Sequence, residues 1–205
     1  MNWIDKKLYL ILDTSYIDPE NIIPVAEECC EAGVDIVQFR DKTLSDKDKF
    51  LLCAKLRQII TIPFIINDRL DIALAVNADG VHLGQDDMPV AIARSILAEC
   101  GRTMIIGRST HSLQQARHAE REGVDYIAIG PLLPTQTKPD YPAVGINLAQ
   151  QVTNMTALPV FAIGGVNLNT IDSIVDKGIS RTAVVSAILT AQNKQDIINR
   201  LKNRL

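Results

Sequence analysis

Three polar side chains that could bind an anion stand at alternate positions near the start of the chain: Gln38, Arg40 and Lys42. They end an apolar run that begins at Val34. Because a β-strand points every second side chain to the same side, a strand here would present the amide and both cations in one row. Buried cations are costly unless an anion meets them, and a guanidinium binds phosphate oxygens through two parallel hydrogen bonds. The row indicates a phosphate or diphosphate site; the structural alternative is an Arg40–Asp41 ion pair with Lys42 in solvent.

Two carboxylates at the ends of other apolar runs suit a metal ion. Asp68 and Asp87 each follow such a run. If the two runs are neighbouring strands, about 4.8 Å apart, these carboxylates could share one cation. Two carboxylates with several open positions suit Mg²⁺, which keeps waters and shares phosphate oxygens. The alternative is an Asp68–Arg69 surface pair, with Asp86 or Asp87 capping the next helix and Asp86 the better cap.

Eight short apolar runs recur along the chain, with amphipathic stretches between them. The runs are Leu8–Leu12, Asp35–Phe39, Ile62–Ile66, Gly80–Leu83, Met104–Ile106, Tyr126–Ile129, Val160–Ile163 and Thr182–Val185. Apolar strands that alternate with helices predict a parallel sheet covered by helices. Eight such units favour a single α/β domain over residues 1–205, a closed (β/α)8 TIM barrel. An open doubly wound sheet is the alternative, but no Gly-x-Gly-x-x-Gly follows the first run.

Local signals mark where helices begin and where strands follow them. Asp18 with Pro19, Ser45 with Asp48 and Asn169 are each expected to open a helix. A weak internal repeat also appears, in which a small residue ends a helix, an aspartate follows and a strand begins. It occurs at residues 33–37, 78–81 and 123–127.

The remaining strand ends carry groups for a second anion. In such a barrel functional groups lie at the carboxyl ends of the strands. Ser109 follows the fifth run and either donates to phosphate or caps a helix near Ser112, whereas His82 lies within a run and is expected in the core. Residues 130–139, with Pro142, form a long proline-rich loop of a kind that is usually functional and often a lid. Gly164–Gly165 and Val185–Ser186 end the last two runs, where backbone amides commonly bind phosphate.

Together these residues predict two anion sites and a metal in one pit. No nucleophile with its base is evident in the sequence. Such a site suits the joining of two phosphorylated molecules with diphosphate as the leaving group. Catalysis would then be mainly electrostatic.

Composition limits the other possibilities. The chain has 205 residues, 47% of them hydrophobic and 22% charged, with a net charge of −3. This balance is that of a globular protein with one core, and it gives no footprint for nucleic acid. No segment is long and apolar enough to span a membrane, and no signal sequence is recognised, so we expect a cytoplasmic protein with free, buried thiols at its four cysteines. The oligomeric state stays open, a homo-oligomer included.

The motifs, taken together, resemble thiamine-phosphate synthase, also called thiamine-phosphate pyrophosphorylase. The segments that carry the resemblance are 38–42, 67–69, 80–87, 109–111, 130–138, 163–165 and 185–188. They occur in the family's order and cover residues 8 to about 190. The resemblance implies a TIM barrel that joins hydroxymethylpyrimidine diphosphate to hydroxyethylthiazole phosphate, giving thiamine phosphate and diphosphate by a dissociative route.

The resemblance also implies roles for individual residues. The pyrimidine diphosphate would contact Gln38, Phe39, Arg40, Asp41, Lys42, Asn67, Ser109 and Lys138, and the thiazole phosphate would contact Thr135, Gln136, Thr137, Gly165, Val185 and Ser186. Asp68 and Asp87 would hold Mg²⁺, and Arg40, Lys42 and Lys138 would stabilise the departing diphosphate.

One position departs from the family's pattern. Arg108 precedes Ser109 where a small apolar residue is expected, and Gly-Arg-Ser resembles the related thiazole tautomerases. Asp68, Asp87 and Pro131 favour the synthase. The alternatives are a metal-independent tautomerase and a non-catalytic phosphate-binding barrel.

Overall fold

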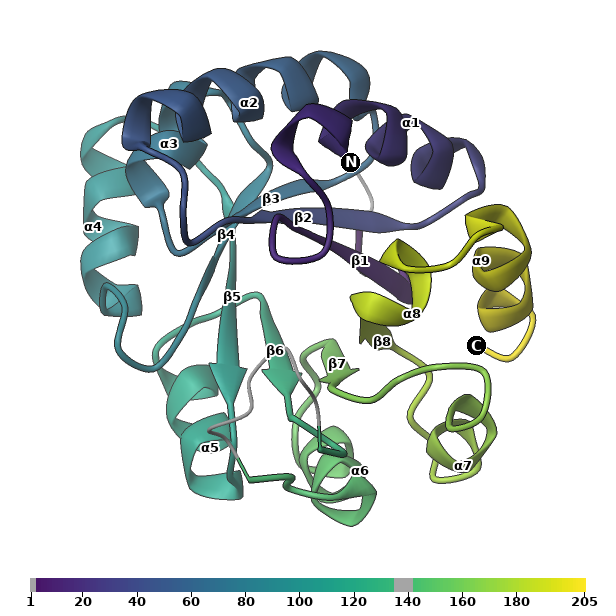
Figure 1. Cartoon of the computed structure of the whole chain (residues 1–205). Helices are drawn as coiled ribbons and strands as arrows, with labels where there is room; N and C mark the ends of the chain where they lie inside the picture. The colour runs from purple at the N-terminus through teal and green to yellow at the C-terminus, as the bar shows by residue number, and fades with distance from the viewer. Residues whose placement is uncertain (1–2, 135–141) are drawn as a thin grey trace.

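Eight parallel strands close into a barrel in the computed structural model, which describes residues 3–134 and 142–205 (Figure 1). Each strand pairs with the next one along the chain, and β8 closes on β1. The strands are β1 (Leu8–Asp13), β2 (Ile36–Arg40), β3 (Phe64–Asn67), β4 (Gly80–Leu83), β5 (Ile105–Thr110), β6 (Tyr126–Ile129), β7 (Val160–Ile163) and β8 (Thr182–Val184). The predicted TIM barrel is confirmed.

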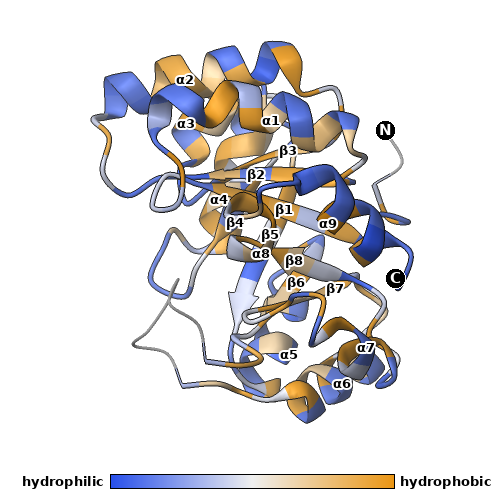
Figure 2. Cartoon of the chain, turned by 45° about the vertical axis from the view of Figure 1, so that its right-hand side comes forward, coloured by the Kyte–Doolittle hydropathy of each residue, from blue (hydrophilic) through white to orange (hydrophobic). Residues whose placement is uncertain are grey.

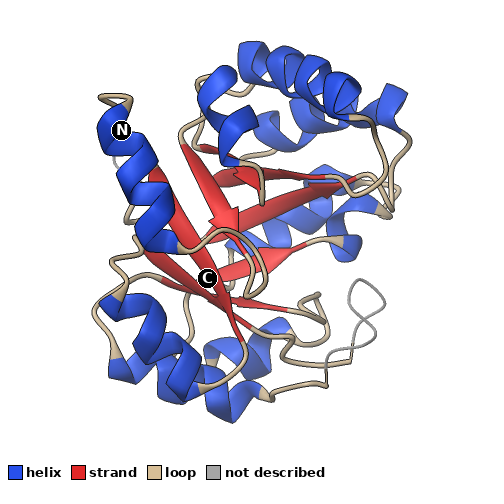
Figure 3. Cartoon of the chain, turned by 90° about the vertical axis from the view of Figure 1, so that its left-hand side faces the viewer, coloured by secondary structure: helices blue, strands red, loops and turns tan. Residues whose placement is uncertain are grey.

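Helices surround the barrel, and Figure 3 shows them outside the ring of strands. They are α1 (Ile22–Glu31), α2 (Asp46–Ile59), α3 (Leu70–Ala75), α4 (Val90–Glu99), α5 (Leu113–Arg121), α6 (Ile146–Met155), α7 (Ile171–Val175), α8 (Ser186–Leu189) and α9 (Lys194–Lys202), with the 3-10 turn η1 (Pro19–Asn21) before α1. Figure 2 shows apolar residues along the strands and polar residues on much of the outer helix surface. The larger hydrophobic core lies between these layers, as expected for a parallel sheet.

A second, smaller hydrophobic cluster fills the inside of the barrel. Its buried members are Tyr9, Ile11, Ile36, Ile65, Tyr126, Phe161 and Ala183. Successive residues of a strand point to opposite faces, so Tyr9 and Ile11 face inward while Leu8, Leu10 and Leu12 join the outer core. The inner cluster therefore lies directly below the polar groups at the carboxyl ends of the strands.

Most predicted elements are present, and the differences have physical causes. Ser45 caps α2 by accepting a hydrogen bond from the Asp48 amide at 3.1 Å, as predicted. The predicted fifth strand was too short, because β5 continues to Thr110 through residues whose polar side chains end the apolar run. Thr170, not Asn169, precedes α7, and Pro89, rather than an aspartate, precedes α4.

The internal repeat has a structural role at the amino ends of the strands. Asp35, Asp79 and Asp125 each precede an even-numbered strand, and each accepts a hydrogen bond from a backbone amide of the preceding strand. The oxygen–nitrogen distances are 2.9 Å to Leu8, 2.8 Å to Phe64 and 2.7 Å to Ile106. Each aspartate also pairs with a cation, which is Lys202, Arg57 or Arg94 respectively. The repeat therefore fastens strands in pairs at the end opposite the predicted pit.

Asp35→Asn should lower the stability of the fold without lowering activity. Burial, the largest single influence, raises the pKa of Asp35, but hydrogen bonds from Leu8, Lys202 and Lys7 together bring it below its usual value of 3.8. A lowered folded-state pKa means that the stabilisation is complete above 3.8 and is lost as pH falls through the folded-state pKa. Hydrogen bonds to a charged group suggest a loss of about 1–3 kcal/mol at neutral pH. Denaturant unfolding at several pH values should find this deficit at pH 7 and find it shrinking in acid; an equal deficit at all pH values would contradict the assignment.

Two further expectations concern the surface and the thiols. In the described parts of the chain no helix has the length and hydropathy needed to cross a membrane. All four cysteines are free; Cys29 and Cys53 are buried as expected, Cys30 is half-buried, and Cys100 is exposed at the end of α4.

Candidate active site

A cavity of about 430 Å³ opens at the carboxyl ends of the strands. Every strand contributes to its wall, so the barrel closure itself brings the predicted groups together. Of the predicted site residues, Gln38, Arg40, Lys42, Asn67, Asp68, Asp87, Ser109, Gly165, Val185 and Ser186 line it. The side chains of Gln38, Arg40 and Lys42 thus face one space. Alternation along β2 accounts for Gln38 and Arg40, whereas the loop after the strand places Lys42.

Arg40 is held by a buried carboxylate that the sequence interpretation did not consider as its partner. Strand register sets Asp13 of β1 directly beside Arg40 of β2, and the Arg40 Nη1 atom lies 2.6 Å from Asp13 Oδ2. Asp13 is 1% exposed and its other oxygen accepts hydrogen bonds from the Ser15 amide and hydroxyl. The expected alternative, an Arg40–Asp41 pair, is wrong. Asp13 fixes one edge of the guanidinium and leaves its remaining N–H groups for an anion.

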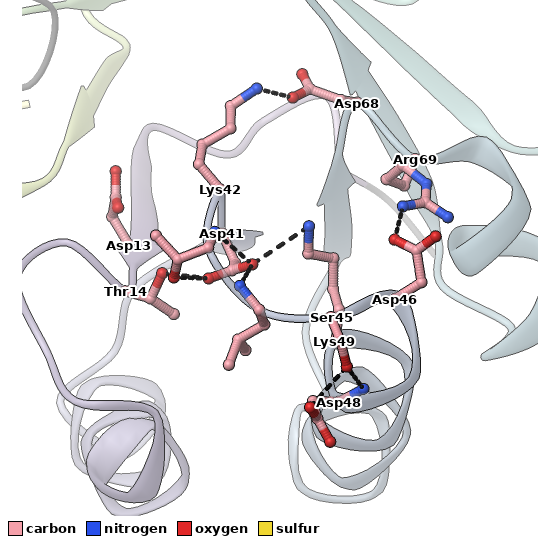
Figure 4. Close-up of polar contacts among 12 residues, drawn as sticks. Asp13, Thr14, Asp41, Lys42, Ser45, Asp46, Asp48, Lys49, Asp68 and Arg69 are labelled. Atoms are coloured by element: carbon pink, nitrogen blue, oxygen red, sulfur yellow. Dashed lines mark hydrogen bonds and ion pairs between the residues drawn. The ribbon is translucent and has the colours of Figure 1, made fainter.

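Two predicted binding residues have side chains directed away from the cavity. Phe39 points to the opposite face of β2 and packs in the outer core, where it is 1% exposed. The Asp41 carboxylate accepts hydrogen bonds from Thr14 Oγ1 at 2.6 Å and the Leu44 amide at 3.0 Å, with Lys49 Nζ at 3.2 Å (Figure 4). Although burial is the largest influence and opposes them, these bonds lower the pKa of Asp41. Asp41 therefore shapes the loop after β2 that presents Lys42.

Lys42 reaches across to Asp68, and the two side chains form an ion pair at the cavity edge (Figure 4). The neighbouring cation Arg69 pairs instead with Asp46 and Asp71, so the alternative Asp68–Arg69 pair is wrong. Asp68 has a φ of 63°, a left-handed conformation uncommon outside glycine. Such backbone strain is typical of positions that place a side chain for function.

Asp68 and Asp87 lie together, as their strand positions predicted. Burial, followed by the hydrogen bond with Asp87, raises the pKa of Asp68. The Asp87 carboxylate also accepts a hydrogen bond from the Gly84 amide at 2.6 Å. Two adjacent carboxylates repel each other when both are ionised, so a cation placed between them would be stabilised.

The donor set fits Mg²⁺. Among the described residues no group of three or more His, Cys, Asp or Glu side chains could hold a metal ion. If this position held a metal ion, Asp68 and Asp87 would be its two carboxylate ligands. Hard carboxylate oxygens with few protein ligands are the usual environment of Mg²⁺ beside a phosphate.

The opposite wall is made of backbone. Gly164 and Gly165 follow β7 with φ values of 95° and 74°. A Cβ atom on Gly164 would lie 2.6 Å from the Pro131 Cα atom, so only glycine lets the loops after β6 and β7 approach this closely. Val185 and Ser186 follow β8 beside them. This wall offers amides and a hydroxyl, whereas the Arg40 wall offers charge.

Ser109 lies within β5 rather than after it, and its side chain faces the cavity. His82, expected in the core, is 6% exposed yet also lines the cavity, with Nε2 2.8 Å from Ser109 Oγ. Arg108, the departure from the family's pattern, points outward and lies 3.4 Å from the carbonyl oxygens of Gln85 and Met88. Ser109 therefore keeps its inward position beside this arginine.

Four predicted residues cannot be placed, and two aromatic residues of the cavity were not predicted. Thr135, Gln136, Thr137 and Lys138 lie outside the described residues. The aromatic rings of Tyr9 and Phe161 line the cavity but were not predicted, because an aromatic residue inside a strand normally indicates core. Their alternation with outward residues was the signal that could have found them.

Comparisons with known proteins agree on one family. The family model described as thiamine monophosphate synthase matches residues 8–188. The thiamine-phosphate synthase of Clostridium acetobutylicum is 41% identical over 199 residues, covering 96% of this chain and 93% of that protein. The thiamine-phosphate synthase of Halalkalibacterium halodurans is 42% identical over 194 residues, covering 92% and 90%.

A solved structure gives the same answer. The thiamine phosphate pyrophosphorylase from Pyrococcus furiosus matches with a TM-score of 0.88 and 32% identity, covering 98% of this chain and 96% of that chain. With the family model and the relatives agreeing over most of its length, the chain belongs to the thiamine monophosphate synthase family.

Proposed function

We propose that this protein is a thiamine-phosphate synthase, which couples hydroxymethylpyrimidine diphosphate to hydroxyethylthiazole phosphate. The observation that carries the proposal is the pairing of two unlike anion walls in one cavity. One wall has Arg40, Lys42 and the two carboxylates, and suits a diphosphate with its metal. The other has the amides near Gly165 and Ser186, and suits a single phosphate. The family supports the same pair of substrates.

The chain's own residues would act mainly by holding charge. The bond from the pyrimidine methylene carbon to the diphosphate oxygen breaks, both electrons leave with diphosphate, and the thiazole nitrogen donates a pair to the methylene carbon. Arg40, oriented by Asp13, and Lys42 would stabilise the charge that builds on the leaving oxygen. Such preorganised donors act most strongly where water is excluded. Lys138, which lies outside the described residues, is proposed to assist.

Mg²⁺ completes this proposal. Asp68 and Asp87 would hold the ion, which when bound neutralises charge on the diphosphate. Lys42 pairs with Asp68 in the structure. We propose that Lys42 would contact phosphate oxygens instead when the pyrimidine diphosphate is bound. Gln38, Asn67 and Ser109 supply the polar contacts proposed for the pyrimidine half. Within this proposal the protein acts in the cytoplasm.

The thiazole phosphate is proposed to bind the backbone wall. Gly165, Val185 and Ser186 would contact the phosphate, with Thr135, Gln136 and Thr137 contributing from the segment outside the described residues. The close approach of the Gly164 and Pro131 backbones supports a rigid wall here.

The test is an assay of purified protein with both substrates. We expect thiamine phosphate and diphosphate in equal amounts, formed with Mg²⁺ and abolished by its chelation or by omission of either substrate. A matched reaction with a thiazole carboxylate and no metal tests the tautomerase alternative. Isomerisation there without any coupling would contradict the proposal, as would absence of both activities.

A further inference from the structure

A chain of hydrogen bonds crosses the inside of the barrel, and four of its five members line the cavity. Five strands contribute one side chain each, in the order Gln38, Tyr9, Tyr126, His82 and Ser109. The successive distances are 2.8, 2.9, 2.9 and 2.8 Å. Phe39 and Leu83, the neighbours of the chain's members on their own strands, face the outer core instead. The polar chain is therefore confined to the inner face, where water has little access.

The ring positions in this chain are fixed by packing. Tyr126 and Tyr9 are 1% and 2% exposed. The Tyr126 ring stacks on His82, with centroids 5.5 Å apart, and meets Tyr9 and Phe161 edge to face. It occupies the space above Gly107 of β5, where a Cβ atom would lie 2.0 Å from the ring. Neither hydroxyl can turn far from its partners without disturbing the inner cluster.

The direction of the chain follows from the number of protons at each member. The Gln38 amide nitrogen can only donate, so Tyr9 Oη accepts there and must place its one proton on Tyr126 Oη. Tyr126 Oη then places its proton on His82 Nδ1. Burial raises the pKa of both tyrosines, so each hydroxyl keeps its proton.

The histidine is thereby set in one form. If His82 carried its proton on Nδ1, Tyr126 would have to donate its own proton to Tyr9. Tyr9 would then accept two hydrogen bonds, and none of the other hydrogen-bonded side chains could accept the Tyr9 proton. His82 must accept at Nδ1 and carry its proton on Nε2, which donates to Ser109 Oγ. The Ser109 hydroxyl, already accepting, is left to donate its proton elsewhere, and Ser109 lines the cavity.

We propose that this chain runs in one direction, from Gln38 to Ser109, and holds the Ser109 hydroxyl as a donor to the bound pyrimidine diphosphate. Tyr126 and His82 are then positioning residues that act through Ser109. The inference rests on the proposed function for the identity of the acceptor, but the hydrogen-bond direction belongs to the protein alone.

Tyr126→Phe is the kinetic test. The variant keeps the ring but removes the donor to His82 Nδ1, so the imidazole proton can move to Nδ1 and Ser109 can turn its proton to Nε2. Loss of one positioned donor predicts a fall in kcat/KM on the order of 10- to 100-fold. In a Ser109→Ala background the same change should cost less than about twofold, because the hydroxyl that it positions is absent. An equal loss in both backgrounds would assign Tyr126 a merely structural role and overturn the proposal.

Two controls separate direction from packing. Tyr16→Phe removes a tyrosine hydroxyl that does not line the cavity and should leave kcat/KM unchanged. Nitrogen-15 NMR of labelled histidine reads the tautomer directly, and with three histidines in the chain His82 can be assigned by its loss in His82→Asn. The substrate-free protein should show His82 protonated at Nε2, and Tyr126→Phe should lose this form.

A His82 protonated at Nδ1 in the wild-type protein would overturn the proposal. The NMR measurement of the His82 tautomer needs no catalysis, so it tests the hydrogen-bond direction even if the coupling assay fails. Failure of that assay with the Nε2 form intact would reject the proposed substrate and keep the hydrogen-bond direction.

Discussion

Arg40→Met is expected to lower kcat/KM for thiamine phosphate formation on the order of 10²- to 10³-fold, the range for loss of one preorganised donor to a developing anion. Arg40 stands where the cation row meets the cavity, and Asp13 holds its guanidinium at 2.6 Å in a fixed direction. Steady-state kinetics with each substrate varied in turn would measure the effect. We expect it in the pyrimidine diphosphate parameters, with the KM for thiazole phosphate little changed.

Loss of stability needs a separate control, because Arg40→Met also leaves Asp13 unpaired. A buried carboxylate without its partner costs about 1–3 kcal/mol or more. Adding Asp13→Asn to Arg40→Met removes that charge and should restore much of the stability without restoring activity. If the double variant recovers both, Arg40 serves only the fold. Arg57→Met, which breaks the Asp79 pair at the other end of the barrel, is the matched variant for an arginine outside the site.

Asp68→Asn should abolish most Mg²⁺-dependent activity, again by on the order of 10²-fold or more, because one of the two proposed protein ligands is neutralised. The fold should not suffer equally. Burial and Asp87 raise the pKa of Asp68, which means that this environment disfavours the charged carboxylate. We expect unchanged or slightly higher thermal stability for Asp68→Asn. Mg²⁺ with diphosphate should raise the melting temperature of the wild-type protein but not that of the variant.

The matched control is Asp71→Asn, which changes an exposed carboxylate on α3 that pairs with Arg69. It should retain activity and the response to Mg²⁺. Full activity of Asp68→Asn, or equal activity of the wild-type protein after chelation of divalent metal, would remove the metal from the proposed mechanism.

The sequence predicted the fold well because the fold depends on short-range patterns. Apolar runs, alternation and a capping serine are local, and they placed β4, β6 and β7 at their observed bounds. The placement of Gln38 and Arg40 is local too, since alternation along β2 puts both on one face, whereas Lys42 lies past the end of that strand. Asp68 and Asp87 could be paired because their strands are consecutive in a barrel.

The missing parts of the site depend on register and on the inside of the barrel. Asp13 was not assigned to Arg40, because only the pairing of β1 with β2 sets them side by side. Phe39 and Asp41 were carried into the site with a contiguous motif, although the alternation that brings Arg40 inward turns their side chains elsewhere. His82 and Tyr126 are buried, and burial alone could not distinguish packing from a directed hydrogen bond. Ser109 was placed in a loop because its strand ends in polar residues.

We propose that the wall of Arg40, Lys42, Asp68 and Asp87 binds the diphosphate group. Titration calorimetry of Mg²⁺ and diphosphate into the protein tests this binding, with Arg40→Met and Asp68→Asn compared with Arg57→Met. We expect one site in the wild-type protein and in Arg57→Met, and affinity at least about tenfold weaker in the two cavity variants, equivalent to about 1.4 kcal/mol. Unchanged binding by both cavity variants would contradict it.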